Sequence, residues 1–534
     1  MKPVLAILLA LLFAAELSAQ LTYDRIRQAV REPGSWLTYH GTYDAQRFSA
    51  LDEINRSNVQ QLRPVWMYQV QGRHHFESTP LVFDGVMYLT DPPSDVVALD
   101  VKTGRPLWAY RRSLPDDLRA CCGDVNRGVA ALGDQIFVAT IDAHLVALDM
   151  RTGRVRWDIE VADRKTGHSL TAAPLAVKDK VIVGMAGAEY GVRGFLDAYD
   201  AATGKRAWRL WTVPGPGEPG HDTWSGDSWK RGGATTWVTG AFDPETNLTY
   251  WGTGNPGPDF IGDVREGDNL YSDSLIAVDV DTGALRWHFQ FTPHDVNDID
   301  ATEIPILVDA DFRGRPRKLL LFANRNGFFY VFDRATGERL LSTPFVKNLT
   351  WASGIGADGR PIRLPNQEPS VAGTKVCPSQ DGATNWFAPS FSPKTGLYYV
   401  QAFEKCSIYS KAAQAAPWAP GKPYLGGSQR VLQEDPTPQR ILRAIDIHTG
   451  RIAWEVPQPG PANSWGGTLA TATGLVFVAE DGGALMAVDA TTGTPLWTFE
   501  ANATWRASPM TYMFDGRQHI AIAAGANILS FAIP

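Results

Sequence analysis

Apolar and polar positions in this chain follow one eleven-residue pattern that returns along most of its length. An apolar pair leads to Asp, Thr-Gly follows, and Trp stands eight positions after Asp. The clear copies are ALDVKTGRPLW (98–108), ALDMRTGRVRW (147–157), AYDAATGKRAW (198–208), AVDVDTGALRW (277–287), AIDIHTGRIAW (444–454) and AVDATTGTPLW (487–497).

Each copy predicts two strands joined by a tight turn. The apolar run forms a strand that ends at Asp, whose short side chain can accept hydrogen bonds from turn amides. Gly can take the left-handed conformation of a bulged hairpin. The second strand then places Trp where its large ring can pack against the next unit. The pattern therefore predicts a series of sheets, each docked on its neighbour by a tryptophan.

The spacing of the copies indicates the architecture. The first three begin at residues 98, 147 and 198, a period near fifty residues that is typical of a four-stranded propeller blade. We interpret VFDRATGERLL (331–341), AFDPETNLTYW (241–251) and SFSPKTGLYYV (390–400) as degenerate copies. The chain then predicts an all-β, eight-bladed propeller, with seven blades as the second count. We expect residues 62–70 to close the ring by pairing with residues 518–534.

The first residues differ from the rest. MKPVLAILLALLFAAELSAQ has one Lys, an apolar run and small residues at Ser18 and Ala19, which predicts a signal peptide over 1–19. An uncleaved anchor helix is the alternative. The remainder, 20–534, is expected to be a single domain outside the cytoplasm, without a membrane span. In an oxidising compartment its four cysteines can form two bridges, and a structural Cys377–Cys406 disulfide is plausible.

Charge excludes one class of partner. The net charge is −7 and no block of basic residues occurs, so nucleic acid is not expected to bind.

Several polar residues interrupt the repeat. Glu189 lies in GMAGAEYGVRG, Asn255 in YWGTGNPGP, and Asp298 and Asp300 in TPHDVNDIDATEIP. Their oxygens suit Ca²⁺ or another hard cation. Each residue alone is more often a turn or capping residue, and their spacing does not decide between the two roles.

These motifs resemble the quinoprotein alcohol dehydrogenases, the methanol and ethanol dehydrogenase family that uses pyrroloquinoline quinone (PQQ). The resemblance runs from about residue 30 to the C-terminus and includes the adjacent cysteines of RACCGDVNRG. Its other motifs are WLTYHGTYDAQRFSALDEINRSNVQQLRPVW (36–66), GAEYGVRG (187–194), GTGNPGP (252–258), the Asp cluster and NRNG (324–327).

The resemblance implies where the cofactor binds. PQQ would lie between Trp237 and a disulfide formed by the neighbours Cys121 and Cys122. The remaining residues that the resemblance implies around PQQ are Glu77, Arg127, Thr171, Gly187, Ala188, Arg325, Asn385 and Trp465.

It also implies a metal and a reaction. Glu189, Asn255 and Asp298 would bind the cation, and Asp298 would act as the general base, with Arg325 as the second catalytic residue. Asp300 stands where lanthanide-dependent members of the family have an additional Asp. A lanthanide ion is therefore expected, with Ca²⁺ as the alternative. The implied reaction oxidises small primary alcohols to aldehydes in the periplasm.

The sequence contains no C-x-x-C-H, so no covalent haem is expected. The resemblance is to the type without a haem domain, which passes electrons to a soluble cytochrome c; a homodimer is left open. Two alternatives share the repeat: a non-catalytic propeller scaffold of the outer-membrane assembly type, and a quinoprotein sugar or polyol dehydrogenase.

Overall fold

The computed structural model describes residues 20–72, 76–432 and 439–534. The predicted signal peptide, 1–19, lies outside these residues. The described part contains no helix long and apolar enough to cross a membrane.

Most regular elements of the described residues are strands. Eight sheets each contain four antiparallel strands, in which every strand is hydrogen-bonded to the next. Sheet 1 comprises β3 (Leu81–Phe83), β4 (Val86–Asp91), β5 (Asp95–Asp100) and β6 (Pro106–Tyr110), and sheet 2 comprises β7 (Ala130–Leu132), β8 (Gln135–Ala139), β9 (His144–Asp149) and β10 (Val155–Glu160). Sheet 3 comprises β11 (Leu175–Val177), β12 (Lys180–Gly184), β13 (Phe195–Asp200) and β14 (Arg206–Trp211), and sheet 4 comprises β15 (Ala241–Asp243), β16 (Leu248–Gly252), β17 (Ser274–Asp279) and β18 (Leu285–Gln290).

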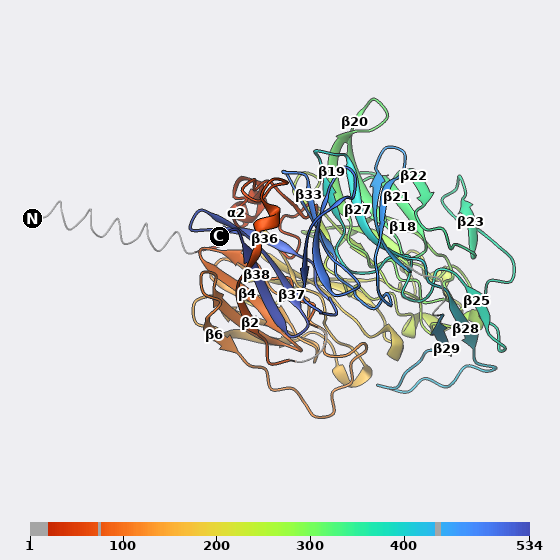
Figure 1. The fold of residues 1–534 in the computed structure, drawn as a ribbon. Helices are drawn as coiled ribbons and strands as arrows, with labels where there is room; N and C mark the ends of the chain where they lie inside the picture. Colours follow the sequence, from red (N-terminus) through yellow and green to blue (C-terminus); the bar gives the residue numbers. More distant parts are fainter. Residues whose placement is uncertain (1–19, 73–75, 433–438) are drawn as a thin grey trace, which may run out of the picture.

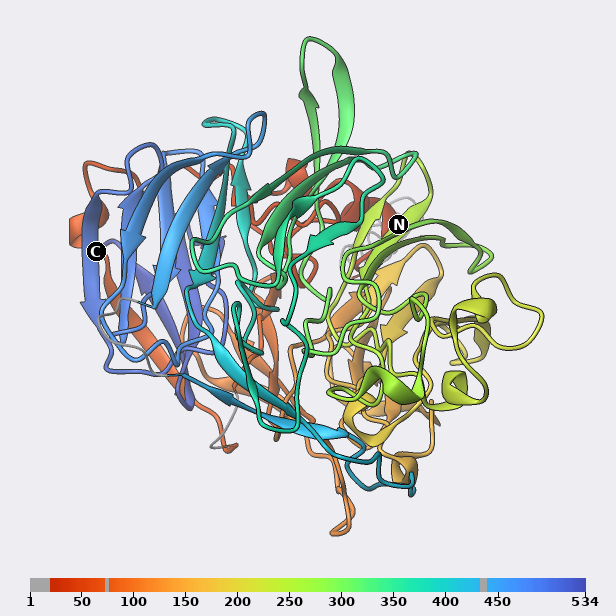
Figure 2. The ribbon, with the colours of Figure 1, turned by 90° about the vertical axis from the view of Figure 1, so that its right-hand side faces the viewer.

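The second half of the chain continues the series (Figure 2). Sheet 5 comprises β19 (Ile306–Asp311), β20 (Pro316–Ala323), β21 (Phe328–Asp333) and β22 (Arg339–Pro344), and sheet 6 comprises β26 (Ser390–Ser392), β27 (Leu397–Phe403), β30 (Arg440–Asp446) and β31 (Ile452–Pro457). Sheet 7 comprises β32 (Thr468–Thr471), β33 (Leu475–Ala479), β34 (Ala484–Asp489) and β35 (Pro495–Glu500), with β1 (Phe48–Ser49) added in parallel. Sheet 8 comprises β36 (Met510–Phe514), β37 (Arg517–Ala524), β38 (Asn527–Ala532) and β2 (Arg63–Gln69).

Sheet 8 joins the two ends of the described chain. Its register places Arg63 of β2 opposite Ala532 of β38, and the two strands lie side by side in Figure 1. This confirms the predicted pairing of residues 62–70 with the last strands.

The remaining elements of the described chain do not belong to these eight sheets. They are the hairpin β23 (Ala352–Ile355) and β24 (Pro361–Arg363), the sheet β25 (Thr374–Val376), β28 (Ser407–Lys411) and β29 (Gly427–Val431), the helix α2 (Tyr23–Arg27), and the 3₁₀ turns Ala29–Arg31, Val59–Gln61, Arg164–Thr166, Ala188–Tyr190, His221–Thr223, Ser228–Arg231 and Gly262–Val264.

The core lies between neighbouring sheets. Phe137 and Leu145 of sheet 2 pack with Val181 and Val183 of sheet 3, for example. The second and third strands are apolar on both faces because sheets cover both. The fourth strand, such as β10, alternates between exposed and half-buried positions because it forms the outer edge.

The repeated pattern forms the outer hairpin of a sheet, as predicted. In the hairpin of sheet 2, Asp149 accepts hydrogen bonds from the backbone N–H and the hydroxyl of Thr152. Gly153 takes a φ of +69°. In sheet 1, Trp108 donates its indole N–H to the carbonyl of Met150 at 3.1 Å, so sheet 1 docks on sheet 2.

The same docking contact recurs at other junctions. Trp66, in β2, makes it without belonging to a clear copy of the pattern, and its indole donates to the carbonyl of Val101. The further indole-to-carbonyl pairs are Trp157–Ala201, Trp208–Val280, Trp287–Arg334, Trp454–Ala490 and Trp497–Leu62. Between sheets 5 and 6, where the pattern has Leu341 instead of Trp, Thr343 donates to the carbonyl of Gly450.

Two interpretations of degenerate copies were wrong about position. AFDPETNLTYW and SFSPKTGLYYV form the first hairpins of sheets 4 and 6, not the outer ones. Asp243 and Ser392 lead into turns that contain Asn247 and Gly396 in the left-handed conformation, because any two-stranded hairpin can use this turn. Trp251 is fully buried and bonds Thr249 within its own strand.

Candidate active site

The loops at one end of the strands enclose a cavity of about 290 Å³. Each of the eight sheets contributes a residue from the loop that precedes its first strand. In sheet order, these residues are Glu77, Arg127, Thr171, Trp237, Asp300, Asn385, Trp465 and Arg506. The loops that follow β12, β16 and β20 add Glu189, Asn255 and Arg325.

Every residue that the sequence assigned to cofactor, metal or catalysis lines this cavity. Those just named were all predicted except Arg506, and the other predicted residues are Cys121, Cys122, Gly187, Ala188 and Asp298. The structure brings these candidate residues together from positions far apart in the chain.

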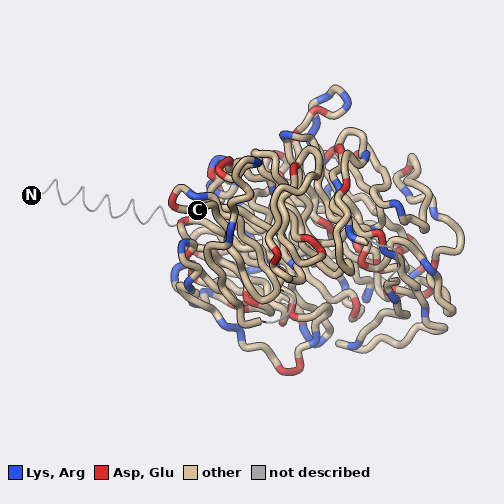
Figure 3. Tube along the Cα trace, viewed as in Figure 1, with Lys and Arg blue, Asp and Glu red and all other residues tan. Residues whose placement is uncertain are grey.

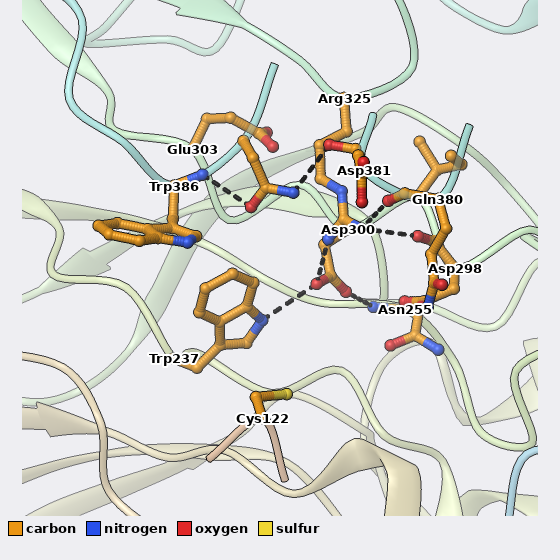
Figure 4. A network of polar contacts seen from close by, with 12 residues as sticks. Cys122, Trp237, Asn255, Asp298, Asp300, Glu303, Arg325, Gln380, Asp381 and Trp386 are labelled. Atoms are coloured by element: carbon orange, nitrogen blue, oxygen red, sulfur yellow. Dashed lines mark hydrogen bonds and ion pairs between the residues drawn. The ribbon is translucent and has the colours of Figure 1, made fainter. Parts of the chain in front are cut away.

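Asp300 lies at the centre of the polar contacts in the cavity (Figure 4). Its Oδ2 accepts hydrogen bonds from the indole of Trp237 at 3.1 Å and from Nη1 of Arg325 at 2.6 Å. Its Oδ1 accepts from the backbone N–H of Asn255 at 2.6 Å. One carboxylate therefore fixes an aromatic ring, a guanidinium group and a candidate ligand loop relative to one another.

Asp298 is held by the same group of residues. Its backbone has a φ of +57°, and its carbonyl accepts from Nη2 of Arg325 at 3.0 Å. Burial, and then the charge of Asp300, raise the pKa of Asp298 well above its ordinary value; Arg325 and a hydrogen bond from Gln380 act in the opposite direction. Burial lowers the pKa of Arg325, but the carboxylates of Asp300, Asp298 and Glu303 outweigh burial and raise it above its ordinary value.

The adjacent cysteines form a disulfide beside Glu189. Glu189 Oε1 lies 2.7 Å from Sγ of Cys121 and 3.7 Å from Sγ of Cys122. Burial is the main reason why the pKa of Glu189 rises to about 7, and the charge of Asp300 adds to it. Because both sulfurs are bonded to each other, these cysteines offer no thiolate, and the ligands available here are oxygens. The predicted Cys377–Cys406 pair is also bonded.

Arg127 contacts Trp237 and other residues that line the cavity. Its guanidinium carbon lies 5.0 Å from the centre of the Trp237 ring and 4.5 Å from that of Trp386. It also forms an ion pair with Glu77 at 2.8 Å and donates to the Thr171 hydroxyl at 3.0 Å. Burial is the main cause that raises the pKa of Glu77.

Sequence reasoning missed several residues that line the cavity: Val125, Ala186, Thr235, Gln380, Asp381, Trp386 and Arg506. A regular spacing could have found two of them. Glu77, Thr171 and Trp237 each stand four positions before the first strand of their sheet, as do Trp386 and Arg506. Gln380 has no such signal.

The chain matches the family model described as glucose/ethanol/alcohol dehydrogenase, beta-propeller domain, over residues 36–347 and 360–520. The chain belongs to this family. It is 39% identical to quinoprotein alcohol dehydrogenase PedH of Pseudomonas putida, over 97% of this chain and 91% of that protein. It is 36% identical to a quinoprotein ethanol dehydrogenase of Pseudomonas putida, over 92% of this chain and 85% of that protein.

Solved structures agree with this membership. A europium-containing methanol dehydrogenase superposes with a TM-score of 0.89 at 32% identity, covering 95% of this chain and all of that one. The predicted family and the predicted β-propeller fold are thus confirmed.

Proposed function

We propose that this protein oxidises primary alcohols to aldehydes with PQQ as its cofactor and a bound cation. One observation carries the proposal: every candidate cofactor, metal and catalytic residue of this family member lines the same cavity. A quinoprotein sugar or polyol dehydrogenase would use the same chemistry with another substrate. A non-catalytic scaffold would have no use for this set of buried carboxylates and guanidinium groups.

The cavity fits a flat, polyanionic quinone. Trp237 offers a ring, and the Cys121–Cys122 disulfide lines the same cavity beside Glu189. Arg127, Arg325 and Arg506 supply three permanent positive charges for carboxylate and carbonyl oxygens. The buried Nε atoms of Arg127 and Arg325 have no hydrogen-bond partner in the described chain. When bound, PQQ would supply an o-quinone that accepts the hydride equivalent of the alcohol.

The oxygens of the cavity fit a hard cation. Glu189, Asn255, Asp298 and Asp300 all line it, and three of the four are carboxylates. Three negative charges suit a trivalent ion of the size of Ca²⁺. We therefore assign a lanthanide ion to these residues, with Ca²⁺ as the alternative.

Asp298 and Arg325 are the residues we assign to the reaction itself. Asp298 would accept the hydroxyl proton of the alcohol, because it is the carboxylate of the cavity whose backbone Arg325 also holds. Arg325 would keep its charge in the buried site, since Asp300, Asp298 and Glu303 surround it. Its ion pair with Asp300 would fix the direction of its remaining donors.

Reconstitution tests the function and the metal together. Purified protein with PQQ and either La³⁺ or Ca²⁺ should reduce an artificial electron-accepting dye when a primary alcohol is added. Because Asp300 also holds Arg325 and Trp237, Asp300→Ala should lower turnover with both metals, but far more with La³⁺ than with Ca²⁺. Equal loss with both metals would refute the lanthanide assignment, and no turnover of any alcohol with either metal would refute the function.

Location and partners complete the proposal. We place the protein in the periplasm, where its two disulfides would persist. A soluble cytochrome c would accept the electrons, and a homodimer is compatible with the proposal. Lysine, arginine, aspartate and glutamate are interspersed along the described chain (Figure 3), so the proposal includes no nucleic-acid partner.

A further inference from the structure

Gln380 contacts both residues that we assign to the reaction. Its side-chain N–H₂ donates to Oδ2 of Asp298, and its backbone carbonyl accepts from Nη2 of Arg325. Figure 4 shows Gln380 beside Asp298 and Arg325, and its side chain lines the cavity. No motif of the sequence pointed to this residue.

The loop that carries Gln380 is attached at several points. The Cys377–Cys406 disulfide fixes its beginning. The backbone N–H of Ser379 then donates to the carbonyl of Lys405 at 2.9 Å, and that of Ala383 donates to the carbonyl of Arg325 at 2.8 Å. These attachments on both sides of Gln380 place its amide at a defined point, so little conformational freedom is lost when it binds Asp298.

Asp298 needs such a partner. With a φ of +57°, its backbone is in the left-handed region, which is sparsely populated by residues other than Gly and persists when neighbouring groups hold it. Arg325 holds the backbone through the carbonyl of Asp298. Without a second contact the carboxylate could still rotate about its side-chain bonds, and the Gln380 amide provides that contact.

We propose that Gln380 is a positioning residue that fixes the carboxylate of Asp298 toward the metal and the alcohol. This inference rests on the proposed function, since it assigns Gln380 a task within the same site. The amide acts as a neutral donor, which orients a carboxylate without neutralising its charge. Partners of this kind, one contact beyond the metal, change metal affinity or activity by about 10–100-fold when they are lost.

Three variants test the proposal in the protein reconstituted with PQQ. Gln380→Met keeps the length of the side chain and removes the donor. Gln380→Glu replaces the amide donor by a carboxylate, which can only accept. It therefore distinguishes a side chain that acts as a hydrogen-bond donor from one that binds the metal directly. The matched control is Gln429→Met in β29, where Gln429 accepts a hydrogen bond from Ser407 outside the cavity.

The readouts are Eu³⁺ affinity from Eu³⁺ emission, Ca²⁺ affinity from competition, and kcat and KM for a primary alcohol. Gln380→Met should lower the affinity for both metals about 10–100-fold and lower kcat by a similar factor, with KM nearly unchanged. Gln380→Glu should also lower the Eu³⁺ affinity, because its carboxylate repels the carboxylate of Asp298 and turns it away from the metal. Gln429→Met should match the wild type.

Several results would overturn the proposal. Metal affinity and kcat of Gln380→Met within twofold of the wild type would do so, as would tighter Eu³⁺ binding by Gln380→Glu, which would make Gln380 a direct ligand position. A thermal melt of each variant detects misfolding, and a Gln380→Met variant that lost only stability would indicate a purely structural role. If the wild type binds Eu³⁺ but oxidises no alcohol, the proposed function fails while the Eu³⁺ affinities still decide the role of Gln380.

Discussion

The outer hairpins and the cavity loops belong to the same eight sheets, but they use the sequence in opposite ways. The outer hairpins repeat one contact, in which a Trp indole donates to a carbonyl of the next sheet. The cavity loops repeat a position and change the residue there, so that Glu77, Thr171, Trp237 and Arg506 occupy equivalent places.

This difference separates stability from chemistry within one fold. A repeated contact can be lost at one junction, because the contacts at the other junctions still hold the eight sheets together. A cavity residue has no duplicate, since a charge or ring at one place in the cavity cannot be supplied from another. We therefore expect changes in the outer hairpins to alter unfolding, and changes in the cavity loops to alter turnover.

The largest effect is expected in the cavity. Asp298→Asn keeps the shape of the side chain and removes the proposed base, and kcat should fall about 10²–10⁴-fold. Dye-linked alcohol oxidation measures the loss, and urea unfolding should show nearly unchanged stability. The control Asp149→Asn, in an outer hairpin, should leave kcat unchanged. A comparable fall of kcat in the control would contradict the separation.

The next effect is expected at a docking tryptophan. Trp208 is 8% exposed and bonds the carbonyl of Val280 at 2.8 Å. Trp208→Ala should lower the free energy of unfolding by about 3 kcal/mol, because it leaves a cavity between sheets 3 and 4. Urea denaturation gives this value, and kcat of the folded fraction should stay the same. A loss of kcat without a loss of stability would show that the two regions are coupled.

A smaller loss is expected at the glycine that faces such a ring. Gly153 has a φ of +69°, and a Cβ there would lie 2.4 Å from Cε3 of Trp108. Gly153→Ala should therefore cost about 2 kcal/mol or more, from the left-handed backbone and the contact with the ring. Gly133, with a φ of +65° and open space around it, is the matched control. Gly133→Ala should lower the free energy of unfolding only by the cost of the left-handed backbone. Equal losses of unfolding free energy in the two variants would mean that the Trp108 ring moves aside without cost.

The smallest effect is expected between sheets 5 and 6, where the docking Trp is missing. Leu341 and Thr343 lie beside Gly450 there. Leu341→Trp restores the pattern and should raise the free energy of unfolding by up to about 1 kcal/mol, measured as a shift of the urea midpoint. A loss of stability would instead show that Leu341 and Thr343 already fill the space.

The sequence predicted the outer hairpins well, because their rule is local. Asp, Gly and Trp at fixed spacing specify a turn and a docking ring, and Asp149, Gly153 and Trp108 behave as expected. The same locality caused the errors at 241–251 and 390–400. A turn that suits any hairpin carries no information about which hairpin of a sheet it forms.

The cavity could be predicted only through the family. Asp298 and Asp300 lie in a recognisable motif of the family, and both line the cavity. Gln380 could not be found in this way, since its contact with Asp298 depends on how the loop between Cys377 and Ala383 folds back on Arg325. Arg506 could have been found from its distance to β36, once the positions of the first strands were known.

The pairing of β2 with β38 sets the order in which the molecule can mature. Sheet 8 lacks its fourth strand until residues 63–69 meet residues 527–532, so the ring closes only when nearly the whole chain is available. Glu77 of sheet 1 and Arg506 of sheet 8 border the cavity on the two sides of this junction. Capture of a cofactor must therefore follow synthesis of the entire domain, and a chain that is still emerging has no complete pocket to offer.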